Sequence, residues 1–88
     1  MEAEIKKRIK GLPYEEALQE LDGYISAHPD DDEALTQRGL RHWGAGKRSL
    51  AINDFLAAVR LNPASPAAHA LVATKDILDY RNKDLYNP

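Results

Sequence analysis

A glycine-rich segment that also carries a lysine and a serine is the first candidate for chemistry in this sequence. Residues 44–49 read Gly-Ala-Gly-Lys-Arg-Ser, and loops of similar composition hold phosphate groups through backbone N–H groups and a lysine. A nucleotide-binding loop needs a glycine where this chain has Arg41, and a serine or threonine where it has Arg48. It also follows a strand, and no strand pattern precedes this segment. Nucleotide binding is therefore not predicted.

Metal-binding and catalytic patterns are equally incomplete. His28, His42 and His69 are too far apart in sequence to form an i, i+4 ligand pair on one helix, and the chain has no cysteine. The acidic run 30–33 has contiguous carboxylates without a following glycine, which favours helix capping over calcium binding. No serine lies in a nucleophile-elbow pattern. We therefore expect a protein that is not an enzyme and that uses no metal and no cofactor.

The composition and net charge of the chain argue against nucleic acid and membrane as its partners. The 88 residues are 43% hydrophobic and 30% charged, with a formal net charge of −2, as expected for one small globular domain. This charge supplies no overall positive field for nucleic acid, and the basic clusters at 6–10 and 38–48 are interpreted as solvated helix faces, with single-stranded nucleic-acid binding as the alternative. The longest apolar run, Phe55 to Val59, is too short for a membrane span. The first residues lack a leader-like segment, so we expect a cytoplasmic protein.

The chain repeats itself at an offset of 34 residues. Small, large apolar and proline positions coincide at this offset even where the residues differ. The matching pairs are Ala17 with Ala51, Leu18 with Ile52, Leu21 with Phe55, Ile25 with Val59, Pro29 with Pro63 and Ala34 with Ala68. A fixed period of this length is typical of stacked supersecondary units.

Each repeat divides into two helical patterns around a break. Apolar residues follow i, i+3, i+4 spacing on both sides of Gly11–Pro13 and on both sides of residues 44–46. We expect one domain over residues 1–88, with a first repeat over 1–31, a second over 32–65, a final helix over 66–82 and a short tail over 83–88. The residues expected to share one apolar face of the final helix are His69, Val72, Ala73, Ile77 and Tyr80.

Capping residues mark two of the helix starts. Asp30 stands three residues before Glu33, a spacing like that of a capping box, and it predicts a helix that begins near Asp32. Ser65 precedes Pro66, and a good N-cap followed by proline at the first helical position predicts the start of the final helix.

These residues resemble the tetratricopeptide repeat, a helix-turn-helix unit of about 34 residues. The second repeat supplies the family's pattern most fully, with Leu35, Gly39, His42, Ala51, Phe55, Ala58 and Pro63. The first repeat supplies Tyr14, Ala17, Leu21 and Pro29. The resemblance implies an all-α fold, a right-handed α-α superhelix made of two helical hairpins and a C-terminal capping helix.

Three positions depart from the pattern of this family. Ile5 stands where the family prefers glycine, Arg38 where it has a buried leucine, and Tyr24 where it prefers alanine. Packing near these residues must therefore differ. Elsewhere, stacked hairpins are expected to build one continuous interior, because a single amphipathic hairpin cannot bury its apolar stripes alone. Small residues allow close helix approach, and those assigned this role are Gly39, Ala51, Ala58 and Ala73.

The resemblance also implies a binding site. In such stacks the first helices of successive units line a concave face that holds an extended peptide or a helix. The residues expected to line it here are Lys6, Ile9, Lys10, Thr36, Gln37, Leu40, Arg41, Trp43, Ala70, Thr74 and Ile77. Lys6, Lys10 and Arg41 would pair with acidic side chains, while the apolar residues would be buried. Alternatively, Trp43 and Ile77 pack against the next layer.

We therefore predict a protein-protein interaction module that binds a protein or peptide, not nucleic acid or membrane, and that is a monomer or a weak homodimer. The alternative is a structural or oligomerising subunit that makes its contact through the final helix and tail. Leu71 and Leu78 lie on a face that a following helix would normally cover, and Leu85 and Tyr86 in the tail either fold back over it or dock on a partner.

The predicted position of Phe55 between the helical layers can be tested by truncation. Phe55→Ala is expected to lower the free energy of unfolding by about 3 to 5 kcal/mol, because it removes a large buried ring and leaves a cavity. Urea denaturation followed by circular dichroism measures this, and an unchanged midpoint would show that Phe55 lies outside the core.

Overall fold

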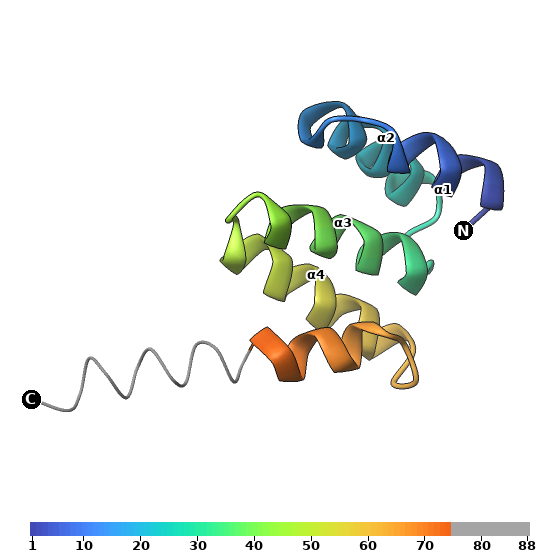
Figure 1. Cartoon of the computed structure of the whole chain (residues 1–88). Coiled ribbons are helices and arrows are strands. Elements are labelled where there is room, and N and C mark those ends of the chain that lie inside the picture. The colour runs from blue at the N-terminus through green and yellow to red at the C-terminus, as the bar shows by residue number, and fades with distance from the viewer. Residues whose placement is uncertain (75–88) are drawn as a thin grey trace, which may run out of the picture.

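The computed structural model describes residues 1–74, in which helices are joined by short turns. The helices are α1 (Ala3–Lys10), α2 (Tyr14–Ala27), α3 (Asp32–Gly44) and α4 (Arg48–Leu61), and residues 67–74 are also helical. No strand occurs among these residues. The predicted all-α class is therefore confirmed for the described part (Figure 1).

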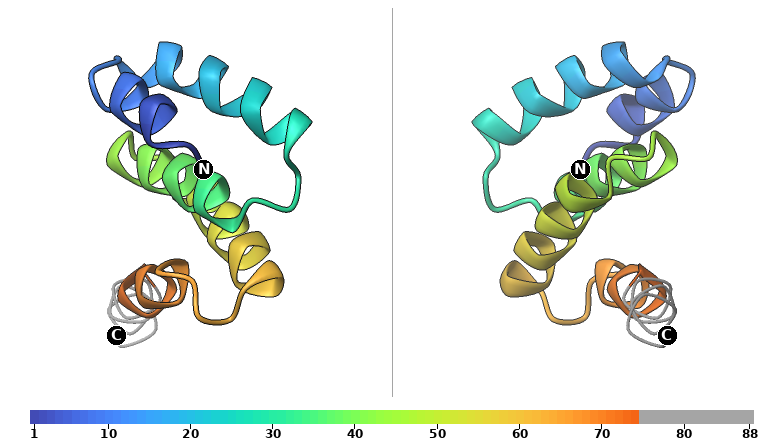
Figure 2. Two further views of the ribbon diagram at one scale, coloured as in Figure 1. Left: turned by 90° about the vertical axis from the view of Figure 1, so that its right-hand side faces the viewer. Right: turned by 90° about the vertical axis from the view of Figure 1, so that its left-hand side faces the viewer.

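Consecutive helices pack on one another along the chain. Contacts join α1 to α2, α2 to α3 and α3 to α4, and those between α3 and α4 are the most extensive. Figures 1 and 2 place α1 and α2 on one side of the α3–α4 pair, and the helical residues 67–74 on the other. Within residues 1–74 no helix has both the length and the apolar character needed to cross a bilayer.

Buried apolar side chains form two clusters instead of the one continuous interior that was expected. The first lies between α1 and α2 and consists of Ile9, Ala17 and Leu21. The second joins α3, α4 and the start of the final helix, and its members are Leu35, Ala51, Phe55, Ala58 and Ala67. Ile25 of α2 packs against both clusters. The interior is divided because charged and polar side chains occupy part of the boundary between the two hairpins, as described below.

Gly39 sets the close approach of α3 to α4. A Cβ atom at Gly39 would lie 2.5 Å from Cε1 of Phe55 and 3.2 Å from the carbonyl oxygen of Ala51. Phe55 is only 1% exposed, and Ala51 and Ala58 are fully buried. The predicted burial of these small residues is confirmed, whereas Ala73 is exposed and does not bring helices together.

Helix α3 begins at Asp32 as predicted, but its capping residue is Asp31 and not Asp30. Oδ1 of Asp31 accepts a hydrogen bond of 3.1 Å from the backbone N–H of Ala34. Either aspartate could have capped the helix from sequence alone, because the carboxylates are contiguous. Tertiary contact distinguishes them, since the hydroxyl of Tyr24 donates to Oδ2 of Asp31.

Two other helix ends follow local rules. The hydroxyl oxygen of Ser65 accepts a hydrogen bond of 3.2 Å from the N–H of Ala67, so the predicted cap of the final helix is confirmed. Helix α3 ends in a turn where Gly46 has a φ of +80° and the N–H of Lys47 donates to the carbonyl of His42 at 2.8 Å. This is the Schellman arrangement, in which glycine adopts the left-handed conformation without a steric penalty.

The final helix turns a different face to the core than predicted. His69, Val72 and Ala73 are exposed, and Ile77 and Tyr80 lie outside the described residues. The residues that are buried or packed against the core are Ala67, Ala70, Leu71 and Thr74. Both sets follow helical spacing, and the observed one places alanines against the core, where their small side chains allow close contact.

The contact between Gly39 and Phe55 predicts opposite effects for the same substitution at two glycines. Gly39→Ala is expected to lower the free energy of unfolding by about 1 to 3 kcal/mol, because the added methyl group overlaps a buried ring. Gly23→Ala in α2 is the matched control, since nothing lies within 4 Å of its added Cβ atom. It is expected to stabilise the protein by roughly 0.5 to 1 kcal/mol through helix propensity. Equal effects in urea denaturation would contradict the assigned role of Gly39.

Candidate functional site

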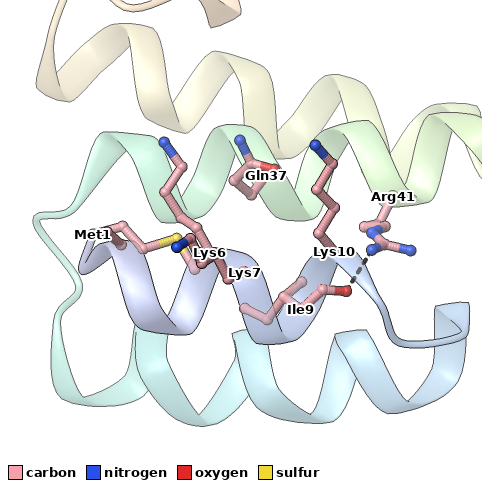
Figure 3. Close-up of a pocket in the computed structure, with 8 residues that line it drawn as sticks. Met1, Lys6, Lys7, Ile9, Lys10, Gln37 and Arg41 are labelled. Carbon is pink, nitrogen blue, oxygen red and sulfur yellow. Dashed lines mark hydrogen bonds between the residues drawn. The ribbon is translucent and has the colours of Figure 1, made fainter.

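A depression of about 500 Å³ lies between α1 and α3. It is lined by Met1, Ala3, Lys6, Lys7, Ile9, Lys10, Gln37 and Arg41, and we call it the α1–α3 groove. Figure 3 shows the side chains of Lys10 and Gln37 on the same side of the two helices, one from each. The groove therefore joins residues that are about 30 positions apart in sequence, with apolar side chains and lysine stems forming much of its wall.

Arg41 fixes the geometry of this groove. Its Nη1 donates to the carbonyl of Leu12 at 3.1 Å, and its Nη2 donates to the carbonyl of Ile9 at 2.5 Å (Figure 3 draws the Ile9 bond). The last carbonyl groups of a helix lack the usual partner four residues further on, and a cation there interacts favourably with the helix dipole. Arg41 thus holds the end of α1 against α3, and these two donors are not free for a ligand.

The charges around the groove are uneven. None of the residues that line it is acidic, although the whole chain has a formal net charge of −2. Lys6 forms an ion pair with Glu33 in the first turn of α3, and both side chains are exposed by 40% or more. Lys7 and Lys10 are exposed and make no ion pair with any other described residue. The groove therefore presents positive charge beside an apolar floor.

A second depression, of about 440 Å³, continues this face toward the final helix. It shares Met1, Lys6 and Gln37 with the α1–α3 groove, and Leu40 also lines it. Leu40 is 48% exposed, so this leucine offers apolar surface to a ligand. The predicted residues Lys6, Ile9, Lys10, Gln37, Leu40 and Arg41 consequently lie along one continuous face.

Two other residues assigned to the concave face are engaged in contacts within the protein, although Thr36 also lines the second depression. The hydroxyl of Thr36 is buried, where it donates to the carbonyl of Asp32 at 2.8 Å and lies 3.2 Å from the Ser65 hydroxyl. Trp43 packs against the α3–α4 cluster, and the guanidinium of Arg48 stands 5.3 Å from the centre of its ring. These side chains hold helices together, which corresponds to the packing alternative for Trp43.

The predicted residues of the final helix divide between the core and the undescribed part of the chain. Ala70 and Leu71 pack against the α3–α4 cluster, and the buried hydroxyl of Thr74 donates to the carbonyl of Leu71 at 2.9 Å. Leu71 is therefore turned inward, and not toward a missing helix as expected. Of the remaining predicted residues, those that lie outside the described part are Ile77, Leu78, Leu85 and Tyr86.

The sequence analysis missed a polar network that joins three of the helices. Arg38 forms two hydrogen bonds with the carboxylate of Asp54, of 2.9 and 2.8 Å, and a third of 2.9 Å with Asp22. Nε2 of His42 lies 3.6 Å from Oδ2 of Asp54, and Nδ1 lies 2.9 Å from the hydroxyl of Tyr14. These five residues connect α2, α3 and α4, and we call them the Arg38 network.

The environment of this network fits a structural role. The side chains of Asp54 and His42 are each 9% exposed, and Asp54 uses both oxygens to bind Arg38. These hydrogen bonds to Asp54 raise the pKa of the Arg38 guanidinium above its usual value, even though burial opposes this. A tyrosine, a histidine and an aspartate in a row resemble a base-assisted nucleophile, but here the aspartate is bound to an arginine. The sequence did contain a sign of this pair, because Arg38 and Asp54 each stand within the apolar stripe of a predicted helix.

A second cluster of polar contacts surrounds Asp31, the capping residue of α3. The Met1 ammonium lies 2.8 Å from Oδ2 of Asp31, the same oxygen that receives the Tyr24 hydroxyl at 2.9 Å. Burial raises the pKa of Asp31, but hydrogen bonds from the ammonium, the Ala34 N–H and the Tyr24 hydroxyl outweigh it, so the pKa lies below its usual value. Asp31 therefore remains a carboxylate at neutral pH and ties the chain start to α2 and α3.

Comparisons with known proteins return no match. No family model matches the chain, and neither the curated proteins nor the solved structures include one that matches it.

The two carboxylates of the Arg38 network allow a matched test of burial. Asp54→Asn is expected to cost about 3 kcal/mol or more, because it leaves the partly buried guanidinium of Arg38 without its charged partner. Asp22→Asn removes an aspartate that is 59% exposed and is expected to cost less than about 1 kcal/mol. Urea denaturation of both variants measures the difference. Similar losses in the free energy of unfolding for the two variants would show that the buried pair of Arg38 and Asp54 matters no more than the exposed pair of Arg38 and Asp22.

Proposed function

We propose that this chain is a protein-interaction module that binds a peptide or a partner segment along the face formed by α1 and α3. The observation that supports this most directly is the α1–α3 groove. Lys6, Ile9, Lys10, Gln37 and Arg41 were assigned to a binding face from sequence, and they line one depression. A shallow groove with an apolar floor and a charged margin suits an extended segment of another protein, because burial supplies affinity and the margin supplies orientation.

A tetratricopeptide-like superhelix is part of the same proposal. Two helical hairpins whose equivalent positions are 34 residues apart support it, as does the packing of Phe55 on Gly39 within the second hairpin. On this view α1, α3 and the final helix are the equivalent inner helices. The Arg38 network then replaces the apolar contact that the family makes at the position of Arg38.

The alternative function is self-association or partner docking through the final helix. One observation favours it: Val72 is 62% exposed on the side of this helix that faces away from the core. With Leu71 turned inward, Val72 takes its place as the described apolar residue that such a contact would use.

Peptide titration of the isotopically labelled chain tests the proposed function. We would use two extended peptides of about ten residues, one alternating glutamate with valine and one alternating lysine with valine. Binding of either peptide is expected to shift the backbone amide signals of Lys6, Lys10, Gln37 and Leu40. Signals that move only around Val72, together with a dimer in light scattering, would favour the alternative.

A pair of glutamine substitutions provides the control. Gln37→Glu places a carboxylate in the α1–α3 groove, whereas Gln19→Glu makes the same change on α2, outside the groove. Gln37→Glu is expected to change the peptide affinity by about fivefold or more through like or unlike charge, and Gln19→Glu by less than about twofold. Equal affinities for both variants would place the peptide elsewhere.

A further inference from the structure

The cations of the α1–α3 groove differ in how far they are already engaged by the protein. Arg41 donates to the carbonyls of Ile9 and Leu12, so it serves the fold. Lys6 is paired with Glu33. Lys7 and Lys10 stand on the same helix, and neither makes an ion pair with a described residue. The groove thus carries two lysines that make no ion pair with a described residue, beside one that Glu33 neutralises.

Glu33 neutralises Lys6 from the opposite helix. It lies in the first turn of α3, where its Oε1 pairs with Nζ of Lys6 and its Oε2 lies 3.8 Å from the Met1 ammonium. It does not line the α1–α3 groove, but it lines the second depression beside it, with Lys6 and Gln37. Its carboxylate therefore stands at the junction of the two depressions, where an acidic ligand spanning both would place one of its own.

We infer that the α1–α3 groove takes an acidic, extended peptide segment, and that Glu33 is its intramolecular competitor for Lys6. This inference rests on the proposed function. It adds that the ligand is negatively charged and that Glu33 lowers the affinity of the groove for it. The ligand's carboxylates pair with Lys7 and Lys10 and displace Glu33 from Lys6. Its apolar side chains lie on the floor formed by Met1, Ala3 and Ile9.

The residues of the groove favour a peptide over a single-stranded nucleic acid. Proteins that bind single strands stack the bases on aromatic side chains, and none of the residues lining the groove is aromatic. The described aromatic residues are used in packing, as Trp43 is under Arg48 and Tyr14 is against His42. A peptide with alternating apolar and acidic side chains can contact both the apolar residues and the lysines of the groove. A sugar-phosphate backbone can pair with the lysines but has no apolar side chains to bury.

The exposure of the ion pair between Lys6 and Glu33 determines how much the peptide affinity should rise when Glu33 is removed. Because the Lys6 and Glu33 side chains are 45% and 40% exposed, their pairing is weak and a ligand can displace it. Removing the competitor should therefore strengthen binding by about two- to fivefold and not by orders of magnitude. Exposed charges are also screened, so the gain should shrink as salt is raised from about 0.05 to 0.5 M.

Fluorescence anisotropy with the labelled Glu-Val peptide tests the inference, with the Lys-Val peptide as the charge-reversed control. Glu33→Gln is expected to tighten binding of the acidic peptide about two- to fivefold at low salt. Glu16→Gln is the matched control, because it removes an exposed glutamate from the first turn of α2, outside the groove, and should leave the affinity within about twofold. Thermal melts of both variants check that the fold is kept.

Lysine substitutions give the complementary result. Lys10→Gln is expected to weaken binding of the acidic peptide by about threefold or more, whereas Lys47→Gln, in the turn before α4, should have less than half that effect. Competition with a single-stranded oligothymidylate completes the experiment. The oligonucleotide is expected not to displace the peptide at equal charge concentration.

The possible outcomes separate this inference from the proposed function. Equal affinity for the two peptides, or equal effects of Glu33→Gln and Glu16→Gln, would overturn the inference while groove amide shifts still supported a binding module. If neither peptide shifts the groove amides, both the inference and the proposed function fail. If the oligonucleotide displaces the peptide and depends on Lys10, the groove is a nucleic-acid site instead.

Discussion

The packing of the Phe55 ring against the backbone of Gly39 is the contact on which the rest of this structure depends. A glycine at this position lets α4 approach α3 closely enough for Ala51 to be buried, and Leu35 joins the same cluster. An additional methylene group on Gly39 or on the facing residue of α4 would force the helices apart, because protein interiors are close-packed. The α3–α4 hairpin is thus the rigid centre against which α2 and the final helix pack.

The boundary between the two hairpins is built on a different principle. Ile25 is the apolar contact shared by both clusters, and beside it the Arg38 network crosses from α2 to α4. A bidentate arginine-carboxylate pair has directional requirements that apolar contacts lack, so it restricts how α2 can slide or rotate on the second hairpin. The gain in net stability from such a pair is small, since both charges lose hydration. Its value here lies in defining the stacking geometry.

That geometry is what creates the candidate binding face. Once α2 is set on the second hairpin, α1 lies beside α3, and Arg41 holds the end of α1 by donating to the carbonyl of Ile9 in its last turn and to that of Leu12 just after it. The lysines of α1 then project along a groove that contains no carboxylate of its own. A chain with a negative formal charge therefore carries a locally positive surface, because the fold separates Lys7 and Lys10 from the acidic residues near them in sequence.

The amino-acid sequence by itself determined the helical class, the break between α3 and α4 near Gly46, the start of α3 at Asp32 and the cap at Ser65. These features depend on local hydrogen bonding and on the spacing of apolar residues, which a short window of sequence contains. Tertiary structure alone decided that Asp31 and not Asp30 caps α3, that Leu71 and not Val72 faces the core, and that Arg38 finds Asp54. In the first two cases the sequence offered two locally equivalent choices, and in all three the outcome depended on a partner on another helix.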